Sequence, residues 1–235
     1  MGNRPRLNWE PSPGVFQLRP EEIHVWAAVM EDQKDTPAWT SLRATLSGDE
    51  CEKAGRFHFE VDQIKFISAR GLLRTLLGRY LDFPPAELRF AYGTHGKPVL
   101  AFPAGGARLD FNVSHSGEAA LFALAWNRPV GVDVEKILPL PEADEIAQRY
   151  FSPAENAQLR EISPGQKMEL FFFFWTRREA ILKCGGQGFG DEAVIQTAFE
   201  TFPGSVSPLA PIPGYSAHLA VEGDSRSLKT WGWTS

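Results

Sequence analysis

Two acidic side chains stand two residues apart in the run GVDVE, residues 131–135. Successive side chains of a strand point to opposite faces, so Asp133 and Glu135 share one face if this run is extended. Two carboxylates about 7 Å apart repel each other unless a cation lies between them. Oxygen ligands of this kind suit Mg²⁺, which takes one or two carboxylates together with substrate phosphates. The run therefore indicates a magnesium site, and the alternative is a strand with a solvated acidic face.

A second pair of charged residues lies in the aromatic segment FFFFWTRREAILKC, residues 171–184. Glu179 and Lys183 are four residues apart, so a helix would place them on one face. This spacing is usually explained by an exposed ion pair, and the phenylalanines are most simply core residues. In the functional interpretation, Glu179 is a third oxygen ligand and Lys183 binds a phosphate one turn further along the helix.

Three shorter motifs add polar groups. FNVSHS, residues 111–116, places small hydroxyl groups beside His115 and could bind phosphate oxygens; the GxSxG pattern of serine hydrolases does not occur here. GKP, residues 96–98, is most simply a turn with a solvated lysine. FSPAE, residues 151–155, has a complete structural explanation, because its serine can cap a helix and its glutamate can close a capping box.

The elements that must position these groups follow a similar order in both halves of the chain. In the first half we expect a strand at 23–30, helices at 47–57 and 62–81, a hairpin at 88–100 and a strand at 118–127. In the second half we expect a strand at 130–137, helices at 142–150, 152–160 and 167–184, and strands at 193–201, 215–223 and 228–233. We therefore predict an α+β fold of two similar lobes, each an antiparallel sheet with a long helix, spanning 1–128 and 129–235. The site would lie in the cleft between the lobes.

The composition narrows the class of protein. With 43% hydrophobic residues, the 235-residue chain can bury a sizeable core. Its formal net charge of −5 argues against general nucleic-acid binding. No apolar run approaches the roughly 20 residues needed to span a bilayer. Cys51 and Cys184 lack CxxC spacing, which is typical of free thiols in a reducing compartment. We expect a cytoplasmic protein that binds neither nucleic acid nor membrane.

Taken in order, the motifs GKP, FNVSHS, GVDVE, FSxxE and WTxxEAxxK resemble those of the Sfp-type (surfactin-type) 4′-phosphopantetheinyl transferases. The resemblance implies that family's pseudo-dimer fold and a Mg²⁺-dependent holo-[acyl-carrier-protein] synthase reaction. In that reaction a serine hydroxyl of an apo carrier protein attacks the β-phosphorus of coenzyme A, and 3′,5′-ADP leaves. The implied partners are coenzyme A and an acyl or peptidyl carrier protein, and family members of this length are typically monomers.

The resemblance also implies roles for individual residues. Asp133, Glu135 and Glu179 would hold Mg²⁺, while Lys183 would touch the diphosphate as a binding and catalytic residue. Glu155 matches the proposed general base toward the serine hydroxyl, a role for which an ordinary glutamate is a weak base. The positions that would hold the nucleotide part of coenzyme A are Lys53, Lys97, Pro98, Ser114 and His115.

Some positions depart from the family pattern. Glu50 stands where relatives can carry a basic residue, Arg178 replaces a more usual lysine, and Lys65 replaces a common arginine. Arg74 fits a recurring arginine that could be an intramolecular strut. The departures at Glu50 and Arg178 favour an alternative function, a non-catalytic module that binds coenzyme A or a carrier protein. A Mg²⁺-dependent diphosphate hydrolase is a third possibility.

Overall fold

The computed structural model describes residues 7–11, 14, 16–30, 33–93, 96–101, 108–186, 192–223 and 227–233. Its strands are β1 (Glu22–Val29), β2 (Phe90–Tyr92), β3 (Pro98–Leu100), β4 (Leu109–Ser116), β5 (Ala119–Trp126), β6 (Val130–Lys136), β7 (Gly204–Leu209), β8 (Tyr215–Glu222) and β9 (Ser227–Gly232). Its α-helices are α1 (Pro37–Arg43), α2 (Gly48–Gly55), α3 (Glu60–Leu81), α4 (Ala143–Tyr150), α5 (Pro153–Glu161), α6 (Lys167–Gly185) and α7 (Glu192–Glu200). Short 3₁₀ turns occupy Pro85–Glu87 and Pro164–Gln166.

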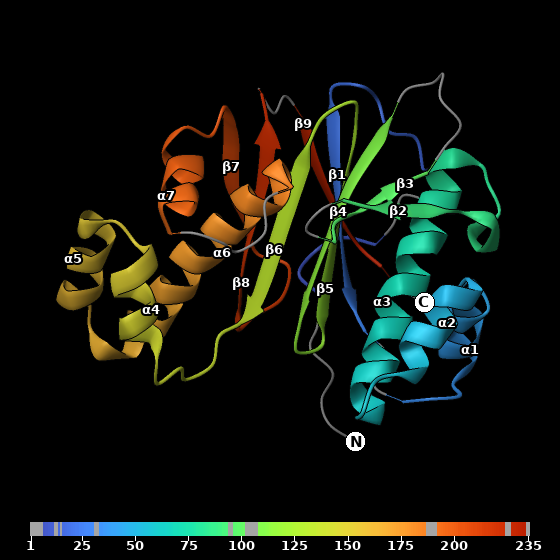
Figure 1. The fold of residues 1–235 in the computed structure, drawn as a ribbon, viewed down its shortest axis with the longest axis horizontal. Coiled ribbons are helices and arrows are strands. Elements are labelled where there is room, and N and C mark those ends of the chain that lie inside the picture. The colour runs from blue at the N-terminus through green and yellow to red at the C-terminus, as the bar shows by residue number, and fades with distance from the viewer. Residues whose placement is uncertain are drawn as a thin grey trace.

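Two sheets pack face to face between two long helices (Figure 1). One sheet has the strand order β4-β5-β1-β9 and the other has the order β6-β8-β7, while β2 and β3 form a separate hairpin. Helix α3 covers the outer face of the four-stranded sheet, and α6 covers the outer face of the three-stranded sheet. The α+β class predicted from the sequence is confirmed, because both sheets carry helices on one face only.

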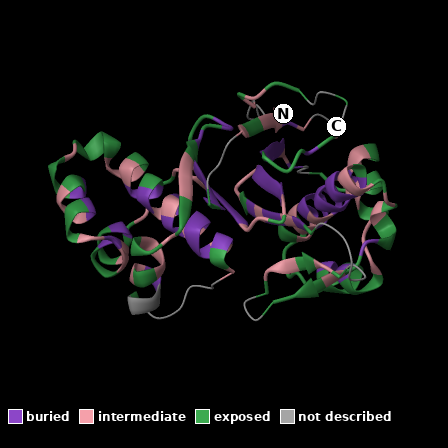
Figure 2. Cartoon of the chain, turned by 90° about the horizontal axis from the view of Figure 1, so that it is seen from above, coloured by how far each residue is buried: buried purple, intermediate pink, exposed green. Residues whose placement is uncertain are grey.

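Strand β5 explains how the layers hold together. Its sequence AALFALAW is apolar throughout, as expected of a strand buried on both faces. Leu121 and Ala123 face the second sheet, whereas Phe122 and Leu124 face α3. Figure 2 shows the result, with buried residues concentrated along the strands and the helices next to them and with exposed residues on the outermost helices.

Two sequence predictions were wrong in detail. Residues 193–201 were expected to form a strand, but they lie almost entirely in helix α7. Ile195 is buried, and Phe199, one turn further along, packs against the hydrophobic cluster that α6 forms with β8. Tertiary contacts on one helical face therefore override the β-propensity of this segment. The expected antiparallel sheets also need correction, because β9 runs parallel to β1, with Trp231 opposite Trp26.

The two long helices agree with the sequence prediction within two residues at each end. Each ends at a residue in the left-handed conformation, Asp82 after α3 and Gly186 after α6. No helix in the described part of the chain combines the length and the apolar character required to cross a membrane.

Candidate active site

Strand β6 presents its two acidic side chains to helix α6. Val132 and Val134 are fully buried between the two sheets. The alternation of a strand therefore sends Asp133 and Glu135 to the opposite face, against α6. Asp133 is only 1% exposed, so its carboxylate is a core group rather than a solvated one. The alternative of a solvated acidic face is thereby wrong for Asp133.

A glycine sets the distance between β6 and α6. A Cβ atom on Gly131 would lie 2.1 Å from the carbonyl oxygen of Ala180 and 2.3 Å from the backbone nitrogen of Cys184. No other residue fits without moving the helix away from the strand. This close approach brings the last two turns of α6 directly over the carboxylates of β6.

Helix α6 places an acidic and a basic side chain, Glu179 and Lys183, beside the carboxylates of β6. Lys183 Nζ donates hydrogen bonds to Asp133 Oδ1 at 2.6 Å and to Ser114 Oγ at 3.1 Å. Lys183 therefore pairs with the strand, and none of the ion pairs found among the described residues joins it to Glu179. Burial and the negative charge of Asp133 raise the pKa of Glu179 to about 7, with a smaller contribution from Glu135.

The charge of Asp133 acts on both Glu135 and Glu179, so the three carboxylates share one electrostatic environment. Burial and the charge of Asp133 also raise the pKa of Glu135, although the hydroxyl of Ser116 opposes this shift. A carboxylate whose charge raises the pKa of its acidic neighbours is typical of a site that binds a cation or a proton.

Alternate side chains of β4 form a polar ladder along the neighbouring edge of β6. The backbone N–H groups of β6 donate to these side chains in three pairs: Val132 to Asn112 Oδ1 at 2.9 Å, Val134 to Ser114 Oγ at 3.3 Å and Lys136 to Ser116 Oγ at 3.2 Å. Because β4 and β6 belong to different sheets, this ladder replaces backbone pairing at the junction. The sequence contained a signal for it, since the polar residues of FNVSHS recur at every second position.

The serines of the ladder also orient the carboxylates. Ser114 Oγ donates to Asp133 Oδ1 at 2.8 Å, and Ser116 Oγ donates to Glu135 Oε2 at 2.6 Å. Asp133 Oδ2 is buried and has no hydrogen-bond partner among the described residues. A buried carboxylate oxygen without a donor suits a metal ligand, since such a group otherwise costs stability.

The three carboxylates do not enclose a metal ion by themselves in this arrangement. Among the described residues, no three acidic, histidine or cysteine side chains lie close enough together to form a metal centre. The donor set nonetheless fits Mg²⁺, because all three side chains offer oxygen and this ion keeps several positions for water and phosphate. The partnerless oxygen of Asp133 provides one coordination position directly.

A buried histidine next to the site was not anticipated from the sequence. His218 lies opposite Asp133 on β8, and its Nδ1 is 2.8 Å from the hydroxyl of Thr176 on α6. Burial lowers the pKa of His218 to about 4, so the ring is neutral at physiological pH. His218 and Thr176 thus help to seat α6 on its sheet without adding charge to the site.

The residues expected to bind the nucleotide lie on several elements. His115 is exposed on the outer side of β4, where partial burial of its ring and the charges of Lys183 and Lys65 lower its pKa. Lys53 is exposed on α2, with its ammonium 5.3 Å from the ring centre of Phe66. The positive charges of Lys65 on α3 and Lys183 on α6 therefore lie near His115, as an anionic ligand would require.

Two other expected nucleotide contacts are already engaged with protein groups. Pro98 begins strand β3 and pairs with Tyr92 in the hairpin. Lys97, just before it, points its ammonium at backbone carbonyl groups of Val130, Lys183 and Cys184. The strand pairing confirms the hairpin expected at 88–100, whereas the carbonyl contacts of Lys97 could not be recognised from the turn motif GKP.

Glu155 forms the capping box expected from FSPAE. Its Oε2 accepts from the backbone nitrogen of Ser152 at 2.8 Å and from the Ser152 hydroxyl at 2.9 Å. The same oxygen also accepts from Arg178, with which it forms a buried ion pair. Among the described contacts, none joins Glu155 to Asp133, Glu135 or Lys183.

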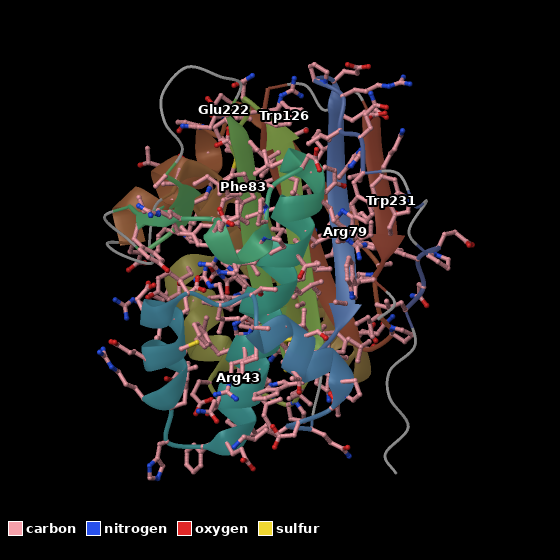
Figure 3. All side chains as sticks on the ribbon, turned by 90° about the vertical axis from the view of Figure 1, so that its right-hand side faces the viewer. Arg43, Arg79, Phe83, Trp126, Glu222 and Trp231 are labelled. Atoms are coloured by element: carbon pink, nitrogen blue, oxygen red, sulfur yellow. The ribbon has the colours of Figure 1, made fainter. Side chains whose placement is uncertain are left out.

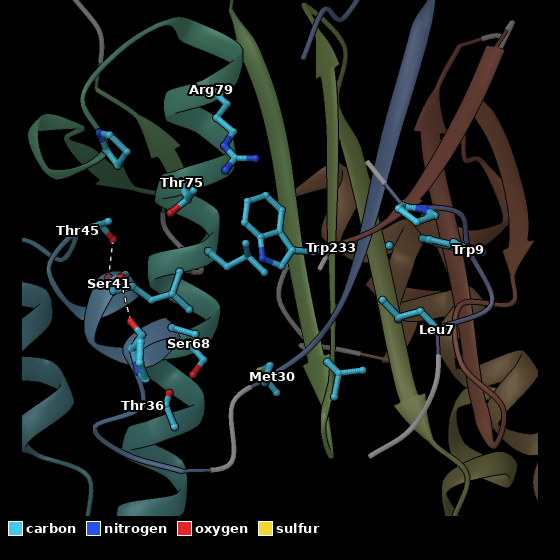
Figure 4. A pocket seen from close by; sticks show the side chains of 18 of the residues that line it. Leu7, Trp9, Met30, Thr36, Ser41, Thr45, Ser68, Thr75, Arg79 and Trp233 are labelled. Atoms are coloured by element: carbon cyan, nitrogen blue, oxygen red, sulfur yellow. Dashed lines mark hydrogen bonds between the residues drawn. The ribbon is translucent and has the colours of Figure 1, made fainter. Parts of the chain in front are cut away.

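A large cavity lies elsewhere, between α3, α1 and the edge of β1 and β9. It has a volume of about 1370 Å³ and is lined by apolar groups and hydroxyls, including Met30, Thr75 and Trp233 (Figure 4). Arg79, labelled in Figure 3, reaches from α3 toward this cavity, and its guanidinium lies 4.6 Å from the ring centre of Trp233. The cavity contains none of the predicted site residues, so size alone does not identify the active site.

The comparisons with known proteins agree with the motif order. A family model described as "4′-phosphopantetheinyl transferase superfamily" matches residues 129–210, and a model of the "4′-phosphopantetheinyl transferase, N-terminal" region matches residues 31–127. The 4′-phosphopantetheinyl transferase HetI of Nostoc sp. is 35% identical over 232 residues, 95% of this chain and 97% of that protein.

Shorter matches connect the chain to other transferases. Sfp of Bacillus subtilis is 29% identical over 144 residues, which is 61% of either protein. AcpT of Salmonella typhimurium is 39% identical over 134 residues, which is 57% of this chain and 65% of that protein. The near-complete match to HetI decides the assignment, and the chain belongs to the 4′-phosphopantetheinyl transferase superfamily.

Proposed function

We propose that this protein transfers the 4′-phosphopantetheine arm of coenzyme A to a serine of an apo carrier protein, releasing 3′,5′-ADP. The observation that carries the proposal is the meeting of β6 and α6. Asp133, with its buried partnerless oxygen, lies there beside Lys183 and close enough to Glu179 to raise its pKa. Neighbouring acids with an adjacent lysine suit a metal-bound diphosphate.

Asp133, Glu135 and Glu179 would hold Mg²⁺, which when bound neutralises charge on the diphosphate of coenzyme A. Lys183 adds a positive charge beside these carboxylates. To bind the diphosphate, it would exchange its contact with Asp133 for a phosphate oxygen. Ser114 and Ser116 keep the two strand carboxylates oriented through their hydroxyl groups. These groups position the diphosphate for attack by the serine hydroxyl.

The nucleotide of coenzyme A would lie toward α2, β3 and β4. Lys53 and His115 are exposed there and can face its phosphates, while Pro98 and Ser114 would line the binding surface. The charges of Lys65 and Lys183 act on His115 and make this region electropositive. An electropositive region in a chain of net charge −5 supports a dedicated anion site.

The role of Glu155 as general base stays a prediction. Its carboxylate oxygen already accepts from Ser152 and Arg178, and these contacts give it a complete structural role. To accept the proton of the serine hydroxyl, Glu155 would have to exchange one of these partners.

We also propose that the chain consists of two corresponding lobes, residues 1–128 and 129–235, with the site at their junction. The strand orders β4-β5-β1 and β7-β8-β6 support this correspondence. In each lobe the first strand (β1 or β6) pairs with the second strand of a hairpin (β4–β5 or β7–β8). Strand β9 crosses from the second lobe to the sheet of the first and ties the two together.

Transfer of a labelled pantetheine arm to a panel of apo carrier proteins, with and without Mg²⁺, tests the function. We expect Mg²⁺-dependent transfer to at least one carrier, and Asp133→Ala should abolish it while weakening coenzyme A binding less. Coenzyme A binding without transfer to any carrier would indicate a binding module. Release of 3′,5′-ADP in the absence of a carrier would indicate a diphosphate hydrolase. Full activity of Asp133→Ala would contradict the metal assignment.

A further inference from the structure

Lys97 links the β2–β3 hairpin to the elements that carry the candidate site. Its ammonium donates to the carbonyl oxygen of Lys183 at 2.6 Å, to that of Val130 at 3.2 Å and to that of Cys184 at 3.4 Å. A lysine has three donors, so these three contacts occupy all of them. The side chain is part-buried, and its desolvation lowers its pKa.

The three carbonyl groups belong to α6 and β6, the two elements whose spacing brings the candidate site residues together. Lys183 and Cys184 lie in the last turn of α6, where carbonyl groups lack the i+4 partners found further back; the Lys183 carbonyl also accepts from the backbone nitrogen of Gly186 at 3.3 Å. The C-terminal end of a helix carries a partial negative charge, which a cation stabilises. Val130 is the first residue of β6, three positions before Asp133. One ammonium therefore fastens the end of α6 to the beginning of β6.

We propose that Lys97 is a positioning residue, which holds the last turn of α6 against β6 so that Lys183 and Glu179 meet Asp133. This inference rests on the proposed function of that site. It differs from the role implied by the family resemblance, in which Lys97 touches the nucleotide of coenzyme A. A side chain that supports α6 acts on every substrate alike, whereas a phosphate contact acts only where that phosphate is present.

The two roles are separated by comparing coenzyme A with 3′-dephospho-coenzyme A. We expect Lys97→Met to lower kcat roughly tenfold or more with both substrates, because small displacements of reacting groups are costly. The ratio of kcat/KM for the two substrates should stay as it is in the wild type. A raised KM for coenzyme A alone, with kcat unchanged, would overturn the proposal in favour of a 3′-phosphate contact.

Amide hydrogen exchange provides a readout that does not depend on activity. In Lys97→Met, a peptide covering the end of α6, residues 179–186, should exchange faster than in the wild type, and Lys97→Arg should restore part of its protection. The variant should also need more Mg²⁺ for half-maximal thermal stabilisation. Unchanged exchange in this peptide would overturn the proposal, even if the protein proved to have no transferase activity.

Lys167→Met is a matched control on the same helix. Lys167 lies at the opposite end of α6 and makes a more exposed ion pair with Asp144 at 2.7 Å. We expect this variant to keep wild-type kcat and wild-type exchange at residues 179–186. If Lys97→Met does not fold, Lys97→Gln, which retains a side-chain donor, takes its place. Equal effects of the Lys167 and Lys97 variants would contradict a specific role for Lys97.

Discussion

The long helices α3 and α6 each bury an arginine against the glutamate of a capping box. Glu50 closes the box of α2 and pairs with Arg74 of α3 at 2.6 Å. Glu155 closes the box of α5 and pairs with Arg178 of α6. The same device therefore fastens a short helix to a long one in both halves, 24 residues apart in the first and 23 in the second.

The faces next to these arginines differ. One and five residues after Arg74, helix α3 carries Thr75 and Arg79, which line a cavity with apolar walls. At the same offsets from Arg178, helix α6 carries Glu179 and Lys183, which face the carboxylates of β6. The two long helices thus share the buried ion pair, whereas only α6 carries an acid and a lysine at these offsets.

The two ion pairs are also satisfied to different degrees. Arg74 donates to Glu50 and to the carbonyl groups of Pro85 and Leu88, at 2.8 and 3.0 Å. Arg178 donates to Glu155, while its Nε and Nη1 have no hydrogen-bond partner among the described residues. Rings of Phe151 and Phe199 cover it instead. Arg74 is thus a strut between segments, as the sequence suggested, whereas Arg178 is held more by packing.

The largest expected effect tests whether the face of α6 that carries Glu179 is catalytic while the corresponding face of α3 is structural. Glu179→Gln should lower kcat for transfer by roughly 10²- to 10³-fold, the usual loss when one preorganised charge is removed. Thr75→Val, at the corresponding position of α3, should leave kcat within about twofold. Steady-state transfer assays at saturating coenzyme A measure both. A comparable loss in the two variants would end the distinction between a catalytic and a structural face.

The next effect tests the ion pairs through the free energy of unfolding. Arg74→Met should cost about 3 kcal/mol, at the low end for a broken buried pair, because Arg70 stays 3.5 Å from Glu50. Arg178→Met should cost less, since it removes fewer hydrogen bonds and two unpaired nitrogens. Urea denaturation of both variants gives the comparison. A larger loss for Arg178→Met would show that ring packing outweighs the hydrogen bonds.

A pair of isosteric changes tests the base role of Glu155. Glu155→Gln and Glu50→Gln should each lower the free energy of unfolding by about 1–3 kcal/mol, because a charged partner of a buried arginine is lost. Below the melting temperature of both variants, kcat should remain near the wild-type value in Glu50→Gln, whereas the predicted base role requires it to fall in Glu155→Gln. A fall in kcat of about 10² or more in Glu155→Gln alone would identify this residue as the general base.

The smallest effect is a difference in pH dependence between the halves. The folded state raises the pKa of Glu179 from 4.5 to about 7, so ionising this group weakens stability as pH rises through that window. The folded state lowers the pKa of the buried His24 in the first half from 6.5 to about 4, so its contribution to stability grows as pH rises from 4 to 6.5.

Melting curves without metal separate these contributions. Relative to the wild type, Glu179→Gln should become progressively more stable between about pH 4.5 and 7, because it cannot ionise. Mg²⁺ should stabilise the wild type more at pH 8 than at pH 6, since protons compete for the same carboxylate. A pH-independent difference between the two proteins would show that Glu179 titrates normally.

Local patterns in the sequence determined much of the secondary structure of this protein and which charged side chains share a face. The capping box at Glu155, the long helices, and the shared face of Asp133 and Glu135 follow from interactions between residues a few positions apart. Such interactions are written into spacing and propensity, and they were predicted correctly. The i, i+4 spacing of Glu179 and Lys183 was also read correctly as one helix face, although the partner of Lys183 is Asp133.

Only the tertiary structure decided what these elements meet. Helix α7 forms where a strand was expected because Ile195 is buried and Phe199 packs against α6 and its sheet. The carbonyl partners of Lys97 lie up to 87 residues away, and no local pattern specifies them. The ladder from β4 exists because two sheet edges lie side by side. The sequence thus determined which groups could do chemistry, and long-range packing determined which of them are brought together.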